Sequence, residues 1–175
     1  MRPLNDFQAW IASTGDAAIR IVQELGFQEL EPIYAPAAAT DLCFSPDGQI
    51  GYAALPGAGM VWKFDADTRN AIDTYPLSGG PVDVDISSNG HYLAAADSSS
   101  GLLRIWDLGD ELSYDLQCGT RAIKPVFAET FASLYVLCPD EGFVLRIDVG
   151  GEEPAITDTI SCEPSPYAIG LWEQP

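Results

Sequence analysis

The stretch Met60–Pro81, MVWKFDADTRNAIDTYPLSGGP, decides the fold because its pattern returns about every 42 residues. It reads as a strand ending in Asp65, a polar turn, a second strand and a Gly-Gly-Pro corner. The apolar strand that ends in an acid recurs as LRIWD, ending at Asp107, and as VLRID, ending at Asp148. One repeat earlier, IRIVQ ends at Gln23. These four copies of one strand predict a repeat protein.

Three further strands recur with the same period, and their alternation and their β-branched or aromatic residues are typical of strands of about five or six residues. One precedes tight turns such as Pro46-Asp47-Gly48, one is small and apolar, and one is polar and variable. The equivalent positions are Phe44, Ile86 and Phe127 in the first of these strands, and Ala12, Ala54, Ala96 and Leu137 in the second. Residues 16–25, DAAIRIVQEL, favour a helix in isolation, but their fit to the repeat predicts a strand.

The order of these strands predicts an all-β protein, a four-bladed β-propeller. The chain begins with three strands of a repeat, continues with three complete repeats, and ends with one more strand at 167–172. That last strand is the one the first repeat lacks, so we expect it to pair with the strand around Ala9–Ser13 and close the ring. The expected blades of this single domain, 1–175, are 7–35 with 166–173, then 39–79, 81–119 and 122–162.

Charge restricts the class of partner. The chain has 26 acidic and 8 basic residues, a net charge of −18, while 47% of it is apolar. Such a surface repels nucleic acid and anionic membranes, because phosphate binding needs clustered Lys and Arg. We therefore expect protein partners, including self-association, and no nucleic acid or membrane. The chain has no apolar run of signal-peptide or membrane-spanning length, which predicts a soluble, non-secreted protein located in the cytoplasm or in a virion.

Four cysteines are present, and none forms a CxxC pair. Cys43, Cys118, Cys138 and Cys162 lie among apolar or turn residues, which favours buried free thiols over a disulfide framework. Cys118 and Cys162 occupy similar places in successive repeats, so a pairing between these two stays open.

The residues 81–97, PVDVDISSNGHYLAAAD, resemble the strand pair of the YVTN-type propeller repeat, and FDADTRNAIDTYPLSGGP resembles its other half. LLRIWDLG is similar to the closing strand of a WD40 blade. The resemblance extends from about Phe7 to Trp172 and implies a propeller that serves as an interaction platform, although some relatives are enzymes. Two features depart from it: no blade has the Gly-His pair of WD40 repeats, and four blades are fewer than the usual seven or eight. A ring built from two chains stays open, although the closing strand favours a complete ring.

No catalytic set, cofactor motif or metal-ligand motif stands out in the sequence. The only histidine, His91, follows an Asn-Gly turn, where we expect it to be exposed or to cap the turn. Asp83 and Asp85 alternate with apolar residues of a predicted inner strand, so they are candidates for lining an axial channel that holds a water or a cation. The strand-ending acids Asp65, Asp107 and Asp148 are expected to accept backbone N–H bonds in the turns that follow.

The two predicted faces of the propeller differ in charge. Loops on one face carry eleven acids, and loops on the other carry five among Gly, Pro, Ser and Ala. The second face includes the apolar loops 33–39 and 55–59, which we expect to be covered by another chain. The candidate partner-contact residues are Ile33, Tyr34, Pro36, Leu55, Pro56 and Met60.

These patterns favour a non-enzymatic interaction or structural module that uses one face of a propeller, as a component of a larger assembly such as a phage virion or tail. The alternative is a small hydrolase or lactonase-like enzyme with carboxylates, Asp83 and Asp85, at the mouth of the channel. A third hypothesis is self-association, in which two rings stack on the apolar loops.

Overall fold

Strands make up nearly all the regular structure of the protein. The computed structural model describes residues 7–129, 132–163 and 165–172, and within them the one helix is the single 3-10 turn η1 (Pro56–Ala58). The strands are β1 (Gln8–Ile11), β2 (Ala18–Gln23), β3 (Gln28–Tyr34), β4 (Asp41–Phe44), β5 (Ile50–Leu55), β6 (Met60–Asp65), β7 (Ala71–Pro76), β8 (Pro81–Ile86), β9 (Tyr92–Asp97), β10 (Leu102–Asp107), β11 (Leu112–Gln117), β12 (Ile123–Phe127), β13 (Ser133–Cys138), β14 (Phe143–Asp148) and β15 (Ala155–Ser161).

Consecutive strands pair antiparallel to form four separate sheets, which we call blades 1 to 4. Blade 1 has three strands, β1–β3, whereas β4–β7, β8–β11 and β12–β15 form four-stranded blades. The all-β prediction is therefore confirmed, and β2 is a strand despite the helical preference of its residues. Packing in the sheet outweighs local propensity there, because β2 pairs on both sides, with β1 and β3.

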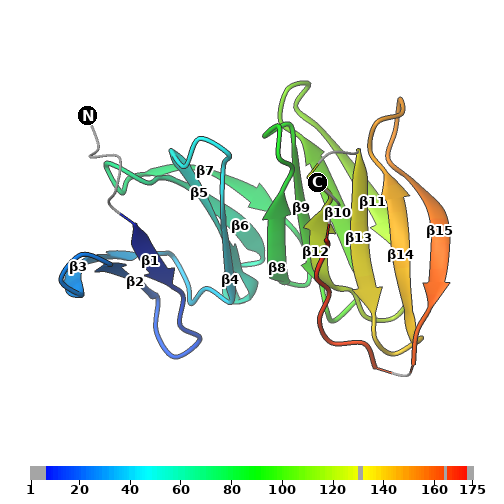
Figure 1. The fold of residues 1–175 in the computed structure, drawn as a ribbon, viewed down its shortest axis with the longest axis horizontal. Coiled ribbons are helices and arrows are strands. Elements are labelled where there is room, and N and C mark those ends of the chain that lie inside the picture. The colour runs from blue at the N-terminus through cyan, green and yellow to red at the C-terminus, as the bar shows by residue number, and fades with distance from the viewer. Residues whose placement is uncertain (1–6, 130–131, 164, 173–175) are drawn as a thin grey trace.

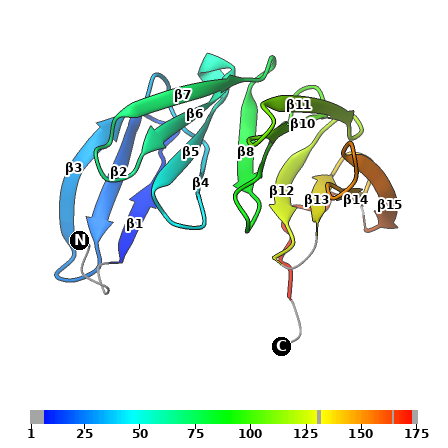
Figure 2. The ribbon, with the colours of Figure 1, turned by 90° about the horizontal axis from the view of Figure 1, so that it is seen from above.

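The four blades stand side by side in an open arc, with blade 1 at one end and blade 4 at the other (Figure 2). The first strand of each complete blade, β4, β8 or β12, lies at one edge of its sheet, and these three inner strands face the concave side of the arc. The last strand of each blade lies at the opposite edge of its sheet.

The predicted closing strand is not formed. Residues 165–172 adopt no strand conformation, and within the described part of the chain β1 pairs with β2 alone. Ile169 instead packs against Ile123 and Leu137 of blade 4, at the other end of the arc from β1 (Figures 1 and 2). The packing between neighbouring blades sets the turn from one blade to the next, and three such junctions do not bring blade 4 round to blade 1. Closure within one chain was the wrong prediction; residue 173, also assigned to blade 1, lies outside the described residues.

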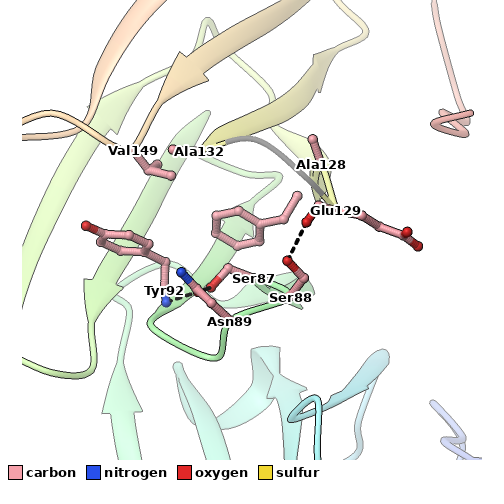
Figure 3. Close-up of a pocket in the computed structure, with 9 residues that line it drawn as sticks. Ser87, Ser88, Asn89, Tyr92, Ala128, Glu129, Ala132 and Val149 are labelled. Atoms are coloured by element: carbon pink, nitrogen blue, oxygen red, sulfur yellow. Dashed lines mark hydrogen bonds between the residues drawn. The ribbon is translucent and has the colours of Figure 1, made fainter. Parts of the chain in front are cut away.

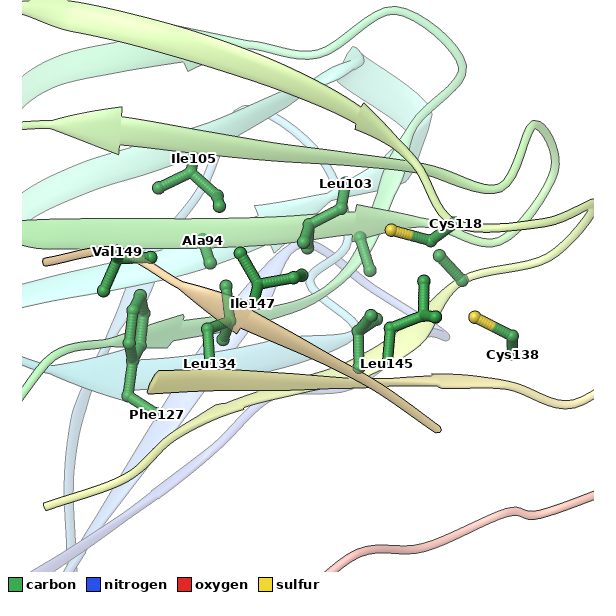
Figure 4. Packing of buried hydrophobic residues seen from close by; sticks show 13 residues of the cluster. Ala94, Leu103, Ile105, Cys118, Phe127, Leu134, Cys138, Leu145, Ile147 and Val149 are labelled. Atoms are coloured by element: carbon green, nitrogen blue, oxygen red, sulfur yellow. The ribbon is translucent and has the colours of Figure 1, made fainter. Parts of the chain in front are cut away.

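The core lies between the blades, because each sheet buries its faces on its neighbours. Between blades 3 and 4, the small residue Ala94 leaves room for Leu103, Leu134 and other aliphatic side chains (Figure 4). Ala96 belongs to the same cluster. Leu103 and Leu134 are fully buried. Because alternate side chains of each strand point to opposite faces of its sheet, each blade contributes an apolar face to the core shared with its neighbour.

Aromatic rings fill the junction between blades 1 and 2. Trp10 lies 5.2 Å from the Phe44 ring and 5.8 Å from the Phe64 ring, measured between ring centroids. Gly51 leaves the room that Phe64 occupies, since a Cβ atom at Gly51 would lie 2.1 Å from the Phe64 ring. The strand β5 therefore needs glycine at this position for packing.

Candidate contact surface and the axial carboxylates

The loops 33–39 and 55–59 lie next to each other on one face of blades 1 and 2. A Cβ atom at Gly57 would lie 3.8 Å from the Cβ of Ala37. Ala37 and Met60 also pack against the same cluster, the core between blades 1 and 2. The sequence-based expectation that these loops share a face agrees with this arrangement.

Two of the six predicted contact residues cannot meet a partner. Ile33 is 5% exposed and Leu55 is fully buried, because each side chain points into the core between blades 1 and 2. Sequence position at the end of a strand does not reveal this orientation. Tyr34 is 75% exposed and Pro36 is exposed, while Pro56 and Met60 are half-buried.

The axial carboxylates connect the inner strands of neighbouring blades. Asp41 of β4 accepts a hydrogen bond from the backbone N–H of Val84 in β8, at 3.1 Å. In the same way, Asp83 and Asp85 of β8 accept backbone N–H groups of β12, from Lys124 at 3.1 Å and from Phe127 at 2.8 Å. An inner strand is an edge strand, so its N–H groups need such acceptors. These carboxylates therefore hold adjacent blades together.

Lys124 adds a charge pair to this cluster, because its Nζ forms an ion pair with Asp83. Partial burial lowers the pKa of Lys124, but the hydrogen bond to Asp83 and the charge of Asp41 outweigh it and raise the pKa. Burial raises the pKa of Asp41 and Asp85, against the stabilising backbone N–H bonds that both accept. Asp41 and Lys124 were not among the predicted axial residues, although each lies one repeat from Asp83 and the period places all three at equivalent positions.

The strand-ending acids have the structural role predicted for them. Asp65 Oδ1 accepts the backbone N–H groups of Asp67 at 3.0 Å and Thr68 at 2.6 Å. Asp107 and Asp148 accept backbone N–H groups in the equivalent turns, at 2.9 Å in each case. These bonds organise the turn after each strand, which explains why an acid recurs there.

A cavity of about 240 Å³ opens between the turns of blades 3 and 4 on the face opposite the apolar loops (Figure 3). Its polar groups are already engaged: Ser88 Oγ donates to the carbonyl of Glu129 at 2.7 Å, and Ser87 Oγ accepts the N–H of Tyr92 at 2.9 Å. The cavity is smaller than most ligand pockets, which range from about 300 to 1,000 Å³. The hydrogen bonds around the cavity connect turns of adjacent blades, and this supports a structural role over a substrate site.

A larger groove of about 500 Å³ runs along the outer edge of blades 2 and 3. It contains Lys63 and Arg104, two of the few basic residues. Lys63 Nζ lies 6.0 Å from the Tyr75 ring centroid, and Arg104 bonds both oxygens of Asp115, each at 2.5 Å. Arg104 is thus paired with a carboxylate within the protein, and Lys63 lies over an aromatic ring.

Other candidate chemical groups are inert or remote. Burial raises the pKa of the Cys118 and Cys138 thiols to about 12, so these thiols stay protonated near neutral pH. All four cysteines are free, but Cys162 is exposed and Cys43 half-buried, which corrects the expectation that all are buried. His91 is exposed, and its backbone N–H donates to Asn89 at 3.0 Å. Within the described residues, no three His, Cys, Asp or Glu side chains converge as metal ligands would.

Comparison with known proteins agrees with the repeat pattern. The family described as WD40 (WD domain, G-beta repeat) matches residues 71–107. The sequence matches no curated protein. The described helix is far too short to cross a membrane.

Solved structures similar to the chain are larger proteins. A functionally unknown protein from Desulfotomaculum acetoxidans DSM 771 has a TM-score of 0.75 and 15% identity over 90% of this chain and 53% of that one. Kuenenia stuttgartiensis hydrazine synthase has a TM-score of 0.72 and 16% identity, over 85% of this chain and 49% of that one. The RRP9 WD40 repeats have a TM-score of 0.67 and 19% identity, over 90% and 45%. The chain thus spans about half the length of these proteins, and the likeness concerns the fold.

Proposed function

We propose that this WD40-like β-propeller repeat protein is a non-enzymatic interaction module that binds a protein partner through the apolar loops of blades 1 and 2. The observation that carries the proposal is the pair of adjacent loops, 34–37 and 56–60, which present the exposed Tyr34 and Pro36 beside half-buried Pro56 and Met60. Tyrosine is enriched at interfaces because it offers a large apolar area and a polar end. Ile33 and Leu55, which precede these loops, anchor them because both side chains are buried in the core between blades 1 and 2.

The net charge of −18 bears on the kind of partner. A neutral or basic protein surface would approach such a molecule without electrostatic repulsion, whereas nucleic acid and anionic lipid would be repelled. The exposed part of the two loops carries no acidic side chain between residues 33 and 39 or between 55 and 60. This supports docking at the apolar loops in preference to the acid-rich turns of the opposite face.

The alternative, a hydrolase with carboxylates at the channel mouth, is less well supported. Asp83 is 7% exposed, and its two oxygens are bonded to the backbone and side chain of Lys124. Asp85 accepts the N–H of Phe127. Carboxylates that connect blades in this way support a structural role. The suggestion of a phage particle or tail stays a prediction from composition.

A pull-down with matched variants tests the proposal. Immobilised wild-type protein should capture a partner that the double variant Tyr34→Ala/Pro36→Ala fails to capture. The control is Leu25→Ala, because Leu25 is 80% exposed and belongs to a turn on the opposite face. If the double variant still captures the partner and Leu25→Ala does not, the contact lies on the opposite face and the proposal is wrong. Turnover of a carboxylate ester or lactone, abolished by Asp85→Asn, would support the enzyme instead.

A further inference from the structure

Among the described residues, blade 1 has three strands, whereas each of the other blades has four. In blades 2, 3 and 4 the inner position is filled by β4, β8 and β12, whereas the inner edge of blade 1 is β1 itself. Within the described residues, β1 pairs only with β2, so one edge of β1 is open to another strand. An open strand edge is a template for pairing.

The segment 165–172 has the sequence of the missing strand. Its residues Pro166–Leu171, PYAIGL, align with Pro81–Ile86, PVDVDI, of the inner strand β8. Apolar side chains recur at equivalent positions, Ile169 with Val84 and Leu171 with Ile86. The described part of the chain therefore contains one strand-like segment without a sheet and one sheet without its inner strand.

The segment also has the position and direction of an inner strand, in the place that would follow blade 4. The N–H of Ser165 donates to the carbonyl of Pro139 at 3.1 Å, and Ile169 packs against Ile123. Leu171 and Trp172 line a cavity with Val126 and Phe127, so the segment runs parallel to β12. β8 runs parallel to β12 in the same way, since Asp83 bonds to Lys124 and Asp85 to Phe127.

The outward faces of blades 1 and 4, at the two ends of the arc, carry apolar side chains that an adjacent blade would cover. On blade 4, Ile123, Leu137 and Val144 form a small cluster, against which Ile169 and, from blade 3, Val82 pack. Leu137 alternates along β13 with residues of the core shared with blade 3, so its side chain lies on the opposite side of the sheet from that core. On blade 1, Ile11 is 48% exposed and points away from the side where Trp10 packs on blade 2. Tyr167 and Trp172 are each 79% exposed beside the blade 4 face. These apolar side chains match a blade junction that has only one half in place.

We propose that two copies of this chain complete one propeller by exchanging their 166–172 segments, each segment becoming the inner strand of blade 1 in the other copy. Each copy supplies four sheets, so the pair forms an eight-bladed ring with a two-fold axis, and both junctions between copies are the same. The segment and blade 1 lie at opposite ends of the arc, which prevents the exchange within one copy but suits two copies (Figure 2).

The repeat predicts the register of the exchanged strand. In blade 3, Asp83 pairs with Ala96 and Asp85 with Ala94. Ala168 and Gly170 are the equivalents of these acids, and Ala12 and Trp10 are the equivalents of the alanines. Ala168 of one copy should therefore face Ala12 of the other copy, and Gly170 should face Trp10. This proposal is independent of the partner-contact loops.

The mass of the 175-residue chain in solution gives the first test. We expect sedimentation equilibrium to give twice the chain mass of 18.8 kDa. Ala168→Pro should return the mass to that of one chain, because proline cannot donate an N–H to β1. Ala168→Ser is the matched control and should stay dimeric. A wild-type chain that is monomeric at about 100 μM, well above the μM Kd typical of weak protein pairs, would overturn the proposal.

Disulfide cross-linking tests the exchange itself, in a background where the exposed Cys162 is replaced by serine. One variant carries Ala12→Cys and the other Ala168→Cys; mixing them under oxidation should give a covalent dimer that neither variant gives alone. A Ser88→Cys variant mixed with Ala168→Cys is the control and should not cross-link, because Ser88 lies in a turn of blade 3. A chain that carries both substitutions, Ala12→Cys and Ala168→Cys, and forms its disulfide as a monomer would show closure within one copy. A dimer that forms no disulfide in the mixture would show a different interface. Either result overturns the proposal.

Discussion

Blade 3 and blade 1 are built from the same repeat, yet they differ in what surrounds them. β9 of blade 3 has neighbours on both faces, and five of its six residues are buried. β1 of blade 1 occupies the equivalent place and alternates between half-buried and exposed residues. The sequence of a blade determines its sheet, but burial of both faces requires a neighbour on each side. The stability of this protein therefore resides in the junctions between its blades.

The largest expected difference between the two blades is in core truncation. Leu103→Ala in blade 3 should lower the free energy of unfolding by about 2–5 kcal/mol, because the fully buried side chain leaves a cavity between blades 3 and 4. Ile11→Ala in blade 1 should change it by less than about 0.5 kcal/mol, since the side chain is half exposed. Urea unfolding measures both, in the Ala168→Pro chain so that exchange between copies does not contribute. Equal losses would contradict the comparison.

A second difference lies in the acids of two equivalent turns, Asp97 in the turn after β9 of blade 3 and Asp16 in the turn after β1 of blade 1. Asp97 in blade 3 accepts bonds from the Ser99 N–H at 2.8 Å and from the Ser99 and Ser100 hydroxyls at 2.7 and 2.5 Å. Burial raises the pKa of Asp97, but these bonds outweigh it and hold the pKa below the ordinary 3.8. The stability that Asp97 contributes is therefore present above pH 3.8 and is lost as pH falls through the lower folded-state pKa.

Asp97→Asn should accordingly flatten the acid limb of stability, measured by urea unfolding between about pH 2 and 6. Asp16 of blade 1, whose carboxylate lies 2.7 Å from Arg20 on the exposed surface, is the matched control. The bond to Arg20 lowers the pKa of Asp16 in the same direction, but solvent screens the pair. Asp16→Asn should change the acid limb less than Asp97→Asn, and the reverse order would contradict this account.

Thiol reactivity distinguishes a closed junction from the end of the arc. Cys118 and Cys138 are buried in the core between blades 3 and 4, with pKa values raised to about 12, whereas Cys162 is exposed. We expect Ellman's reagent at pH 8 to modify Cys162 rapidly in the native protein, and Cys118 and Cys138 only after unfolding. Fast native modification of either buried thiol, located by peptide mass, would show that this junction opens.

Salt should have the smallest effect. Each copy has a net charge of −18, so two copies repel each other at long range. Raising the ionic strength from 0.01 to 0.15 M shortens the Debye length from about 30 to about 8 Å and should tighten the dimer. Sedimentation equilibrium at several salt concentrations measures this. A dimer that weakens with salt would indicate that ion pairs, and not the apolar faces of blades 1 and 4, hold the copies together.

The period of the sequence was sufficient to predict the strands, because each strand repeats a two-residue alternation and ends at a turn with Asp, Asn or Gly. It also predicted that Asp65 and its equivalents bond to their own turns. It did not predict the turn between neighbouring blades, which depends on how residues such as Ala96 and Leu103 pack, so the prediction of closure within one chain was wrong. Side-chain direction at strand ends was also beyond the pattern, and Ile33 and Leu55 proved to be buried.

The central claim is that blade 1 obtains its inner strand from a second copy, and hydrogen exchange at β1 tests it most directly. The backbone amides of Gln8 and Trp10, which point away from β2, should exchange slowly in the wild-type chain and much faster in Ala168→Pro, because the variant leaves this edge of β1 open. Amides of β9 should be equally protected in both, since β9 pairs on both sides within its own blade. Exchange at β1 that is the same in the two chains would contradict the claim.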